Sequence, residues 1–190
     1  RLPCFSVSLY RPEVRTTGLQ AVKTENMGKL IHSFDPIVDG GCRILVLGTM
    51  PGEESLRKQQ YYGHPRNAFW PIMAALCGQE LPDAYQHRKA MLLETRIALW
   101  DVCRRCERDG SLDSNISNEA PNRIGELLRQ YPQIRTIAFN GQYAARLFKR
   151  YFPNVDPEIT RIILPSTSPA HAVPLEKKLR AWQAVKDFLK

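Results

Sequence analysis

The stretch GTMPGEESLRKQQYYGHPRNAFW, residues 48–70, brings together side chains that suit a flat, polar ligand. Tyr62 offers a flat aromatic ring on which a planar ligand can stack. Asn67 offers a carboxamide, which both donates and accepts hydrogen bonds. His64 and Arg66 lie between them and could contact phosphate. We therefore interpret this stretch as one wall of a site for a flat, polar ligand.

Two later segments carry chemistry of the same kind. Asn140 falls near the end of the apolar run 134–141. Its carboxamide can pair with the edge of a base or, as a turn residue, bond its own backbone. The sequence LPSTSPAHA at residues 164–172 is rich in hydroxyls, and hydroxyls and backbone N–H groups often bind phosphates. Ser166, Thr167 and Ser168 are therefore predicted to contact phosphate.

The framework for these segments is read from short apolar runs that alternate with segments of helical spacing. The expected strands cover 43–48, 96–102, 134–141 and 161–166, and the expected helices cover 67–78, 120–132, 142–152 and 174–190. This alternation predicts an α/β fold, a three-layer α/β/α sandwich around a central four-stranded parallel sheet. Ligands of such sheets bind beyond the carboxyl ends of the strands, where the polar segments fall.

Composition favours a single domain with a polyanionic partner. The chain has 190 residues, 43% of them hydrophobic, which is enough to bury a core. Lys and Arg number 27 against 19 Asp and Glu, a net charge of +8, which indicates a nucleic acid partner or simply a basic protein. No stretch approaches the ~18 apolar residues of a membrane span. We expect a soluble, cytoplasmic monomer.

Residues 1–26 differ from the rest of the chain. They lack the continuous apolar segment of a secretory signal, and Glu13 and Glu25 fit a transit peptide badly. Met27 heads the stretch that runs into the first strand. We interpret 1–26 as a poorly ordered extension or an artefact of start-site choice, and 27–190 as one catalytic domain.

The five cysteines favour a reducing compartment over a disulfide framework. Cys103 and Cys106 have the spacing of zinc, cluster and redox sites. A zinc site needs a second such pair or two histidines at helical spacing, and the sequence has neither. An iron–sulfur cluster that also uses Cys42 and Cys77 is the weaker alternative. We expect no metal and no other cofactor.

The order and spacing of GTMPGEESL…YYGHPRNAFW, FNG and LPSTSPAHA resemble the uracil-DNA glycosylase superfamily, most closely its hypoxanthine-DNA (deoxyinosine) glycosylase branch. The resemblance runs from Arg43 to Lys190. It implies a monofunctional enzyme of base excision repair that flips a deaminated nucleotide out of double-stranded DNA and hydrolyses the bond between base and sugar. Hypoxanthine is the expected base, and single-stranded DNA is a second expected substrate.

The resemblance implies roles for the first two motifs. Tyr62 stands five positions before Asn67, where the mismatch-specific uracil/thymine glycosylases place the ring that stacks on the flipped base. Tyr62 could otherwise only cover the edge of the core. Asn140 matches the asparagine that contacts the base in relatives with FNG. The expected base pocket is completed by Thr49, Met50 and Gly52.

The resemblance also implies a wedge in the last loop. Pro169, Ala170 and His171 fall where the superfamily pushes into the gap that the flipped base leaves. His171 could steady the departing base or contact a phosphate, and we assign it a catalytic role. Lys177 and Lys178, on the helix that follows, either contact DNA or are only hydrated.

One departure from the wider pattern concerns the chemistry. Many relatives have Asn or Asp, which orients or activates water, where this chain has Met50. We therefore expect the reaction to depend on departure of the base through an oxocarbenium-like sugar, aided by donors worth ~3 kcal/mol apiece. Asn67 becomes the best candidate to place the water, although Asn is also a favoured N-cap for a helix starting at 67. Glu53 and Glu54 are expected to favour a helix start rather than to act as bases.

Three other functions stay open. The base could be uracil or xanthine, or the fold could bind damaged or single-stranded DNA without catalysis. A doubly wound nucleotide-binding enzyme is disfavoured because the chain has no Gly-rich phosphate loop. Around the site, Asp101 could be a site residue, but we favour a structural hydrogen bond for it. We expect residues 110–116 to approach the cleft. Phosphate contact or simple hydration is expected for Arg104, Arg105 and Arg108.

Overall fold

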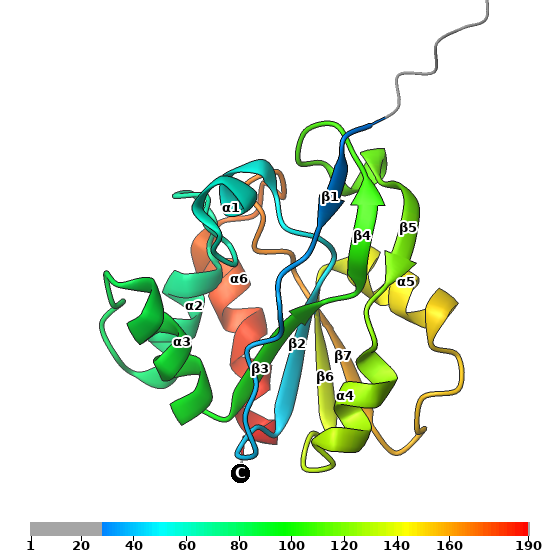
Figure 1. The fold of residues 1–190 in the computed structure, drawn as a ribbon. Coiled ribbons are helices and arrows are strands. Elements are labelled where there is room, and N and C mark those ends of the chain that lie inside the picture. The colour runs from blue at the N-terminus through cyan, green and yellow to red at the C-terminus, as the bar shows by residue number, and fades with distance from the viewer. Residues whose placement is uncertain (1–27, 190) are drawn as a thin grey trace, which may run out of the picture.

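The computed structural model describes residues 28–189, which form two sheets and their covering helices (Figure 1). The central sheet has four parallel strands in the order β3-β2-β6-β7. Their bounds are Ile97–Asp101 for β3, Ile44–Gly48 for β2, Thr136–Asn140 for β6 and Thr160–Leu164 for β7. Every residue of β2 and β6 is buried, as expected for strands covered on both faces.

Helices cover both faces of this sheet (Figure 1). Successive side chains of a strand point to opposite faces, and β2 divides accordingly. Ile44 and Val46 join one apolar core with α2, α3 and α6, whereas Leu45 and Leu47 join a second core with α4 and α5. The predicted three-layer α/β/α sandwich is therefore confirmed. The helices are α2 Phe69–Cys77, α3 Tyr85–Glu94, α4 Ile124–Gln130, α5 Gln142–Tyr151 and α6 Leu175–Trp182.

A second, antiparallel sheet lies at the carboxyl end of the first (Figure 1). Its strand order is β1-β4-β5. Because β4 begins only two residues after β3 ends, the small sheet continues the chain directly from the edge where ligands of parallel sheets bind. Helix α1 follows β2 at the same edge. The bounds are β1 Leu30–His32, β4 Cys103–Glu107, β5 Ser117–Pro121, α1 Glu53–Lys58 and a 3-10 turn, η1, at Asp113–Asn115.

The four strands predicted for the central sheet are confirmed to within two residues, but some helices differ. The helix predicted over 120–132 begins only at Ile124, because residues up to Pro121 pair with β4. The closing helix predicted over 174–190 is α-helical only to Trp182, and a 3-10 segment, η2, covers Gln183–Phe188. The small sheet, α1 as a defined helix and α3 were not predicted.

The predicted extension 1–26 lies outside the described residues. Within residues 28–189, no helix combines the length and apolar character needed to cross a membrane.

Candidate active site

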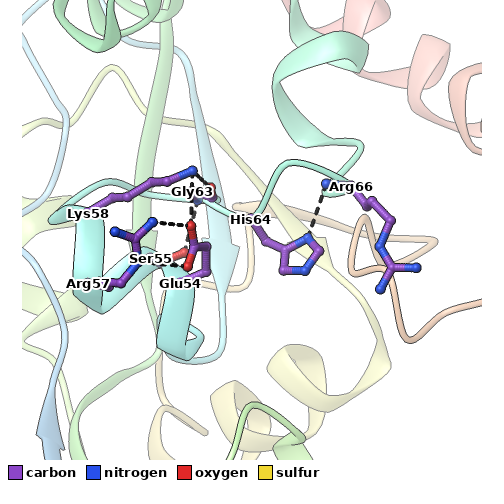
Figure 2. Close-up of polar contacts among 7 residues, drawn as sticks. All are labelled: Glu54, Ser55, Arg57, Lys58, Gly63, His64 and Arg66. Carbon is purple, nitrogen blue, oxygen red and sulfur yellow. Dashed lines mark hydrogen bonds and ion pairs between the residues drawn. The ribbon is translucent and has the colours of Figure 1, made fainter.

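A polar network ties helix α1 to the loop that carries the paired tyrosines (Figure 2). The Ser55 hydroxyl accepts a hydrogen bond from the Gly63 N–H at 3.0 Å, and Lys58 donates to the Gly63 carbonyl at 2.9 Å. Glu54 pairs with Arg57 at 2.6 Å and with Lys58 at 3.1 Å. Both sides of the glycine peptide are therefore anchored, which fixes the loop next to the tyrosine pair.

The acidic residues at the start of α1 serve the helix rather than the chemistry. Helix α1 begins at Glu53, as expected for negative charge near a helix start. Hydrogen bonds from Arg57 and then Lys58 hold the pKa of Glu54 down at about 2. A carboxylate with so low a pKa is a weak proton acceptor near neutral pH. The structure gives Glu54 a role in holding the loop.

Tyr62 lies with one face of its ring against Phe69. The two ring centroids are 4.1 Å apart and the planes differ by 28°. Phe69 is fully buried, whereas Tyr62 keeps part of its surface exposed. The Tyr62 backbone has a φ of 52°, a strained value for a bulky residue, and such strain collects at functional sites. Its neighbour Tyr61 is a core residue, so Tyr62 is the ring available for stacking.

Asn67 is held by local hydrogen bonds that leave its amide nitrogen free. Its Oδ1 accepts from the Phe69 N–H at 3.0 Å, and its own N–H donates to the His64 carbonyl at 2.9 Å. The N-cap of α2 is Ala68, so the predicted cap at Asn67 is wrong by one residue, and its side chain instead makes an Asx-type turn. No hydrogen bond from Nδ2 to residues 28–189 is present, and Asn67 is partly exposed. That nitrogen can therefore meet a water or a sugar.

His64 and Arg66 lie on the rim beside Asn67. The His64 ring accepts a hydrogen bond from the Arg66 N–H at Nδ1, at 3.1 Å, so its proton sits on Nε2. Figure 2 shows the Arg66 side chain extending away from this contact. Arg66 is exposed, as a residue that meets phosphate must be. Their contacts with DNA remain predictions.

Asn140 and Thr167 clasp each other across the site. Asn140 Nδ2 donates to the Thr167 hydroxyl at 2.8 Å, and the Thr167 N–H donates to Asn140 Oδ1 at 2.8 Å. Thr167 is fully buried, so the prediction that its hydroxyl grips phosphate is wrong. An amide has two N–H groups and two lone pairs on its oxygen. Asn140 thus keeps one donor and one acceptor position with which to meet a base.

The loop after β7 is held at four consecutive carbonyls, those of residues 165–168. The Trp182 indole donates to the Pro165 carbonyl at 3.0 Å, and the His171 ring donates from Nδ1 to the Ser166 carbonyl at 3.3 Å. The Ala68 N–H donates to the Thr167 carbonyl at 3.0 Å, and the Lys178 ammonium donates to the Ser168 carbonyl at 3.2 Å. Ala68 follows Asn67 in the chain, and the carbonyl that it bonds belongs to the residue clasped by Asn140. The segment 48–70, the loop 164–172 and the end of β6 therefore meet in one place.

The tip of this loop is exposed. Pro169, Ala170 and His171 all face solvent, and Ser166 and Ser168 are partly exposed. This placement suits a segment that enters DNA, and the predicted contacts stay predictions. Lys177, on α6, is exposed as well.

Lys178 departs from the expectation that it either contacts DNA or is hydrated. It is only 4% exposed, and its ammonium donates to the Ser168 carbonyl. Burial lowers its pKa. The side chain reaches from α6 to hold the loop from within.

We expect Lys178→Met to loosen the loop in the free protein. Methionine keeps an apolar stem but cannot donate, and a lost hydrogen bond of this kind costs about 1 kcal/mol. The His171 N–H, which bonds the Ser168 carbonyl at 3.1 Å, should exchange with solvent about fivefold faster, as measured by hydrogen exchange. Lys177→Met, at the exposed neighbour, is the matched control. Equal exchange in both variants would contradict this role.

The turn after β2 is held from the side by residues 110–116, as expected. The Thr49 hydroxyl donates to Asp113 Oδ2 at 2.8 Å, and the Ser111 hydroxyl accepts from the Glu53 N–H at 3.0 Å. Thr49 and Met50 are buried, and Met50 belongs to the core. Their side chains are therefore not free to meet a base, which corrects the prediction for these two residues. Only their backbone could do so.

The close packing over that turn explains Gly52 and Gly48. A Cβ on Gly52 would lie 3.3 Å from the Ser111 hydroxyl, so the chain passes close to that loop. At Gly48 a Cβ would lie 2.5 Å from Asp101 Oδ1 and 2.9 Å from the Tyr62 hydroxyl. Only glycine lets these two oxygens approach the end of β2 so closely.

Asp101 makes the structural hydrogen bond that was expected. Its Oδ2 accepts from the Ser33 hydroxyl at 2.8 Å. Burial raises the pKa of Asp101 to about 7, against the opposing hydrogen bond from Ser33, and the nearby charge of Asp113 adds to the rise. A carboxyl group with this pKa changes its charge near neutral pH.

The prediction for Arg108 is wrong. It was expected to contact phosphate or to be hydrated, but it is 3% exposed. Its Nη2 donates to the Pro51 carbonyl, and its Nε donates to the Gly110 carbonyl at 3.0 Å. Its guanidinium therefore supports the turn after β2 from the interior of the protein. Arg104 and Arg105 on β4 are exposed, and their contact with phosphate remains a prediction.

An open cavity of about 800 Å³ lies between α1, β1 and residues 108–110. Its walls include Ser33 and Arg108 but not Tyr62, Asn67 or Asn140. The residues predicted to bind and cleave therefore lie outside this cavity.

The cysteines of the described residues do not assemble into a site. Cys42, Cys77, Cys103 and Cys106 are free thiols, and nowhere in 28–189 do three or more His, Cys, Asp or Glu side chains gather as metal ligands. The four-cysteine cluster considered from the sequence does not form.

The molecule is thus a three-layer α/β/α protein with Tyr62, Asn67 and Asn140 gathered near the carboxyl ends of its parallel strands, the edge where ligands of such sheets bind. A family model described as the Uracil DNA glycosylase superfamily matches residues 36–189. The chain belongs to the uracil DNA glycosylase superfamily.

Within this family the chain is similar to proteins of one branch. It is 37% identical over 155 residues to a protein named hypoxanthine DNA glycosylase from Methanosarcina acetivorans, which covers 81% of this chain and 96% of the relative. A protein of the same name from Methanosarcina barkeri is 38% identical over 112 residues, which is 58% of this chain and 71% of the relative. A solution NMR structure of a candidate uracil DNA glycosylase from Methanosarcina acetivorans gives a TM-score of 0.74 at 35% identity, and covers 85% of this chain and 99% of that one. The resemblance to the hypoxanthine branch is confirmed.

Three residues that shape the site were missed or given other roles from the sequence. Ser33 holds Asp101, Asp113 holds Thr49, and Lys178 holds the loop after β7. Each of the three contacts a residue in a different segment of the chain, and none of the three belongs to a sequence motif that predicts the contact.

Proposed function

We propose that this protein flips a deaminated nucleotide out of DNA and hydrolyses the bond between its base and its sugar, with hypoxanthine as the preferred base. The observation that carries the proposal is that Tyr62, Asn67 and Asn140 meet at one edge of the sheet. They are joined there by the contacts of Ala68 and Thr167. Similarity to proteins named hypoxanthine DNA glycosylase, over 96% of one of them, supports this choice of base.

The flipped base would lie on the exposed part of the Tyr62 ring. Phe69 supports the opposite face of that ring, so the base adds to an existing stack, and each base–aromatic contact is worth ~1–3 kcal/mol. Asn140 would pair with the edge of the base through the donor and acceptor that Thr167 leaves free. Flipping costs a few kcal/mol, less for a mismatched pair, and these contacts offset that cost.

Asn67 would place the attacking water. Met50 occupies the position where many relatives carry a polar side chain, and it is buried, so the first turn supplies no side chain to activate water. The base must then depart before attack is complete, through an oxocarbenium-like sugar. Hydrogen-bond donors aimed at the departing base stabilise the charge that develops on it. His171, exposed at the loop tip, is our candidate to steady the leaving base.

The DNA would be double-stranded and bound by a monomer. The exposed tip from Pro169 to His171 would enter the gap, while Ser166, Ser168 and Lys177 hold the backbone beside it. His64 and Arg66 would contact phosphate on the other rim. We place this activity in one catalytic domain, working at the nucleoid in the cytoplasm.

A panel of duplexes that carry deoxyinosine, uracil or xanthine opposite each normal base tests the proposal. We expect abasic sites on the deoxyinosine duplexes, measured as alkali-sensitive strand breaks under single-turnover conditions. A duplex with adenine at the same position is the control. Cleavage mainly of uracil, or tight binding without product, would contradict the proposal.

A further inference from the structure

Two buried polar groups beneath the site, the Tyr62 hydroxyl and the Asp101 carboxylate, have unused hydrogen-bonding capacity of opposite kinds. The Tyr62 hydroxyl is buried and has no hydrogen-bond partner among the described residues. Within 28–189, the only hydrogen bond to the Asp101 side chain comes from Ser33 and reaches Oδ2, which leaves Oδ1 with free lone pairs. The hydroxyl and Oδ1 both face Gly48, at 2.9 and 2.5 Å from the position of an added Cβ. A donor that lacks an acceptor and an acceptor that lacks a donor thus lie over the same glycine.

Of the acceptors near the Tyr62 hydroxyl, Asp101 has the most capacity to spare. Asn140 is its other polar neighbour, but one N–H and one lone pair of that carboxamide already bond Thr167, and the proposed function gives its remaining donor and acceptor to the base. A buried hydroxyl without a partner is destabilising, and buried polar groups nearly always find one. A slight tilt of the ring, such as a base stacking on it would impose, would direct the hydroxyl to Oδ1.

We propose that Asp101 is a positioning residue whose carboxylate accepts a hydrogen bond from the Tyr62 hydroxyl when a flipped base stacks on the ring. The bond fixes the tilt of the ring and thereby the position of the base relative to Asn67. Ser33 completes the arrangement because it holds the other carboxylate oxygen. This inference rests on the proposed function, since it takes Tyr62 as the ring under the base.

The charges around Asp101 set the pH range in which it can act. Burial is the main cause of its raised pKa of about 7. Ser33 and Arg108 oppose the rise and Asp113 adds to it. At pH 8 most of the carboxylate is ionised and is a strong acceptor, whereas at pH 6 most of it is protonated. The remaining ionisable neighbours are neutral groups whose pKa values are raised by burial, namely Tyr61, Tyr62, Tyr85 and Cys103.

The test is a double-mutant cycle of Tyr62→Phe and Asp101→Asn. Phenylalanine keeps the stacking face and loses only the hydroxyl, and asparagine keeps an oxygen for Ser33 and loses the charge. The measured quantity is the single-turnover rate on a deoxyinosine duplex at pH 8 with saturating enzyme. Each single variant should be about tenfold slower. The double variant should also be about tenfold slower, because all three lose the same bond.

A rate–pH profile supplies a readout that a merely structural role would not move. The wild-type rate should fall between pH 8 and pH 6 as Asp101 takes up its proton. Tyr62→Phe should lose that part of the pH dependence, since it has no hydroxyl to offer. Ser33→Ala is a milder variant that can replace Asp101→Asn if the latter does not fold. In the wild-type background it should lower the cleavage rate a few fold, and in the Tyr62→Phe background it should leave the rate unchanged.

Losses that multiply, to about a hundredfold in the double variant, would overturn the inference, as would single variants with wild-type rates. Neither outcome affects the proposed function, which fails only if the wild-type protein forms no abasic sites on deoxyinosine duplexes. The two failures are therefore distinguishable in one set of assays.

Discussion

Asn67→Ala should reduce single-turnover cleavage of a deoxyinosine duplex about a thousandfold and leave DNA affinity nearly unchanged. A preorganised carboxamide that hydrogen-bonds the reacting atoms typically contributes about 10²–10³-fold. The Asn67 amide nitrogen is free of partners among residues 28–189, so alanine removes a group that is available to the reaction. Cleavage is measured with enzyme in excess, and affinity by fluorescence anisotropy on a duplex with a non-cleavable deoxyinosine analogue.

Asn67→Ser is the matched control for the start of α2. A serine hydroxyl can accept the Phe69 N–H in the same kind of turn, which restores the local hydrogen bond, yet it is too short to replace the carboxamide. The serine variant should melt close to the wild type and remain as inactive as the alanine variant. Equal losses of cleavage and affinity, or recovery of activity with serine, would rule out a role for Asn67 in placing water.

Asp101→Asn should stabilise the protein increasingly as the pH rises. The folded protein raises the Asp101 pKa from 3.8 to about 7, so between these values the folded state holds a proton that the unfolded state has lost. The free energy of unfolding must then decrease as pH rises through this range. Asparagine does not titrate and escapes that loss. With 1.36 kcal/mol per pKa unit, the advantage of the variant should grow by roughly 2 to 3 kcal/mol between pH 5 and pH 8.

Urea unfolding at several pH values measures this difference directly. A constant difference between wild type and variant would show that Asp101 has an ordinary pKa in the folded state. Asp156→Asn, at an exposed carboxylate, should show no comparable growth. A stabilised variant that is also slower would mean that the wild type keeps a destabilising charge because the site uses it.

The central sheet could be read from the sequence because its strands are buried on both faces and therefore appear as unbroken apolar runs. The small sheet could not. Strand β4 reads CRRCE and β5 reads SNEAP, and neither run shows apolar alternation, since each gains its stability from pairing with neighbours at bulged registers. Helix α3 carries few buried positions, which leaves its apolar spacing too weak to detect.

The gathering of Tyr62, Asn67 and Asn140 followed from the rule that ligands bind beyond the carboxyl ends of parallel strands. The supporting contacts did not follow from it. Ser33 and Asp101 are 68 positions apart and meet only because residues 28–37 return along β3 and β4. Lys178 reads as one more cation on an amphipathic helix, and only the three-dimensional fold shows that its ammonium is turned inward.

The four bonded carbonyls at 165–168 bear on how such a protein would search a chromosome. A loop that is already rigid before it meets DNA would need no disorder-to-order step at each base pair. Little conformational entropy would then be lost in each encounter. If the loop enters DNA as proposed, undamaged pairs would be probed and released quickly, and the protein would stay longer only where a base leaves the stack. The same rigidity makes the segment intolerant of length change, because removing one residue would shift every later carbonyl away from its donor.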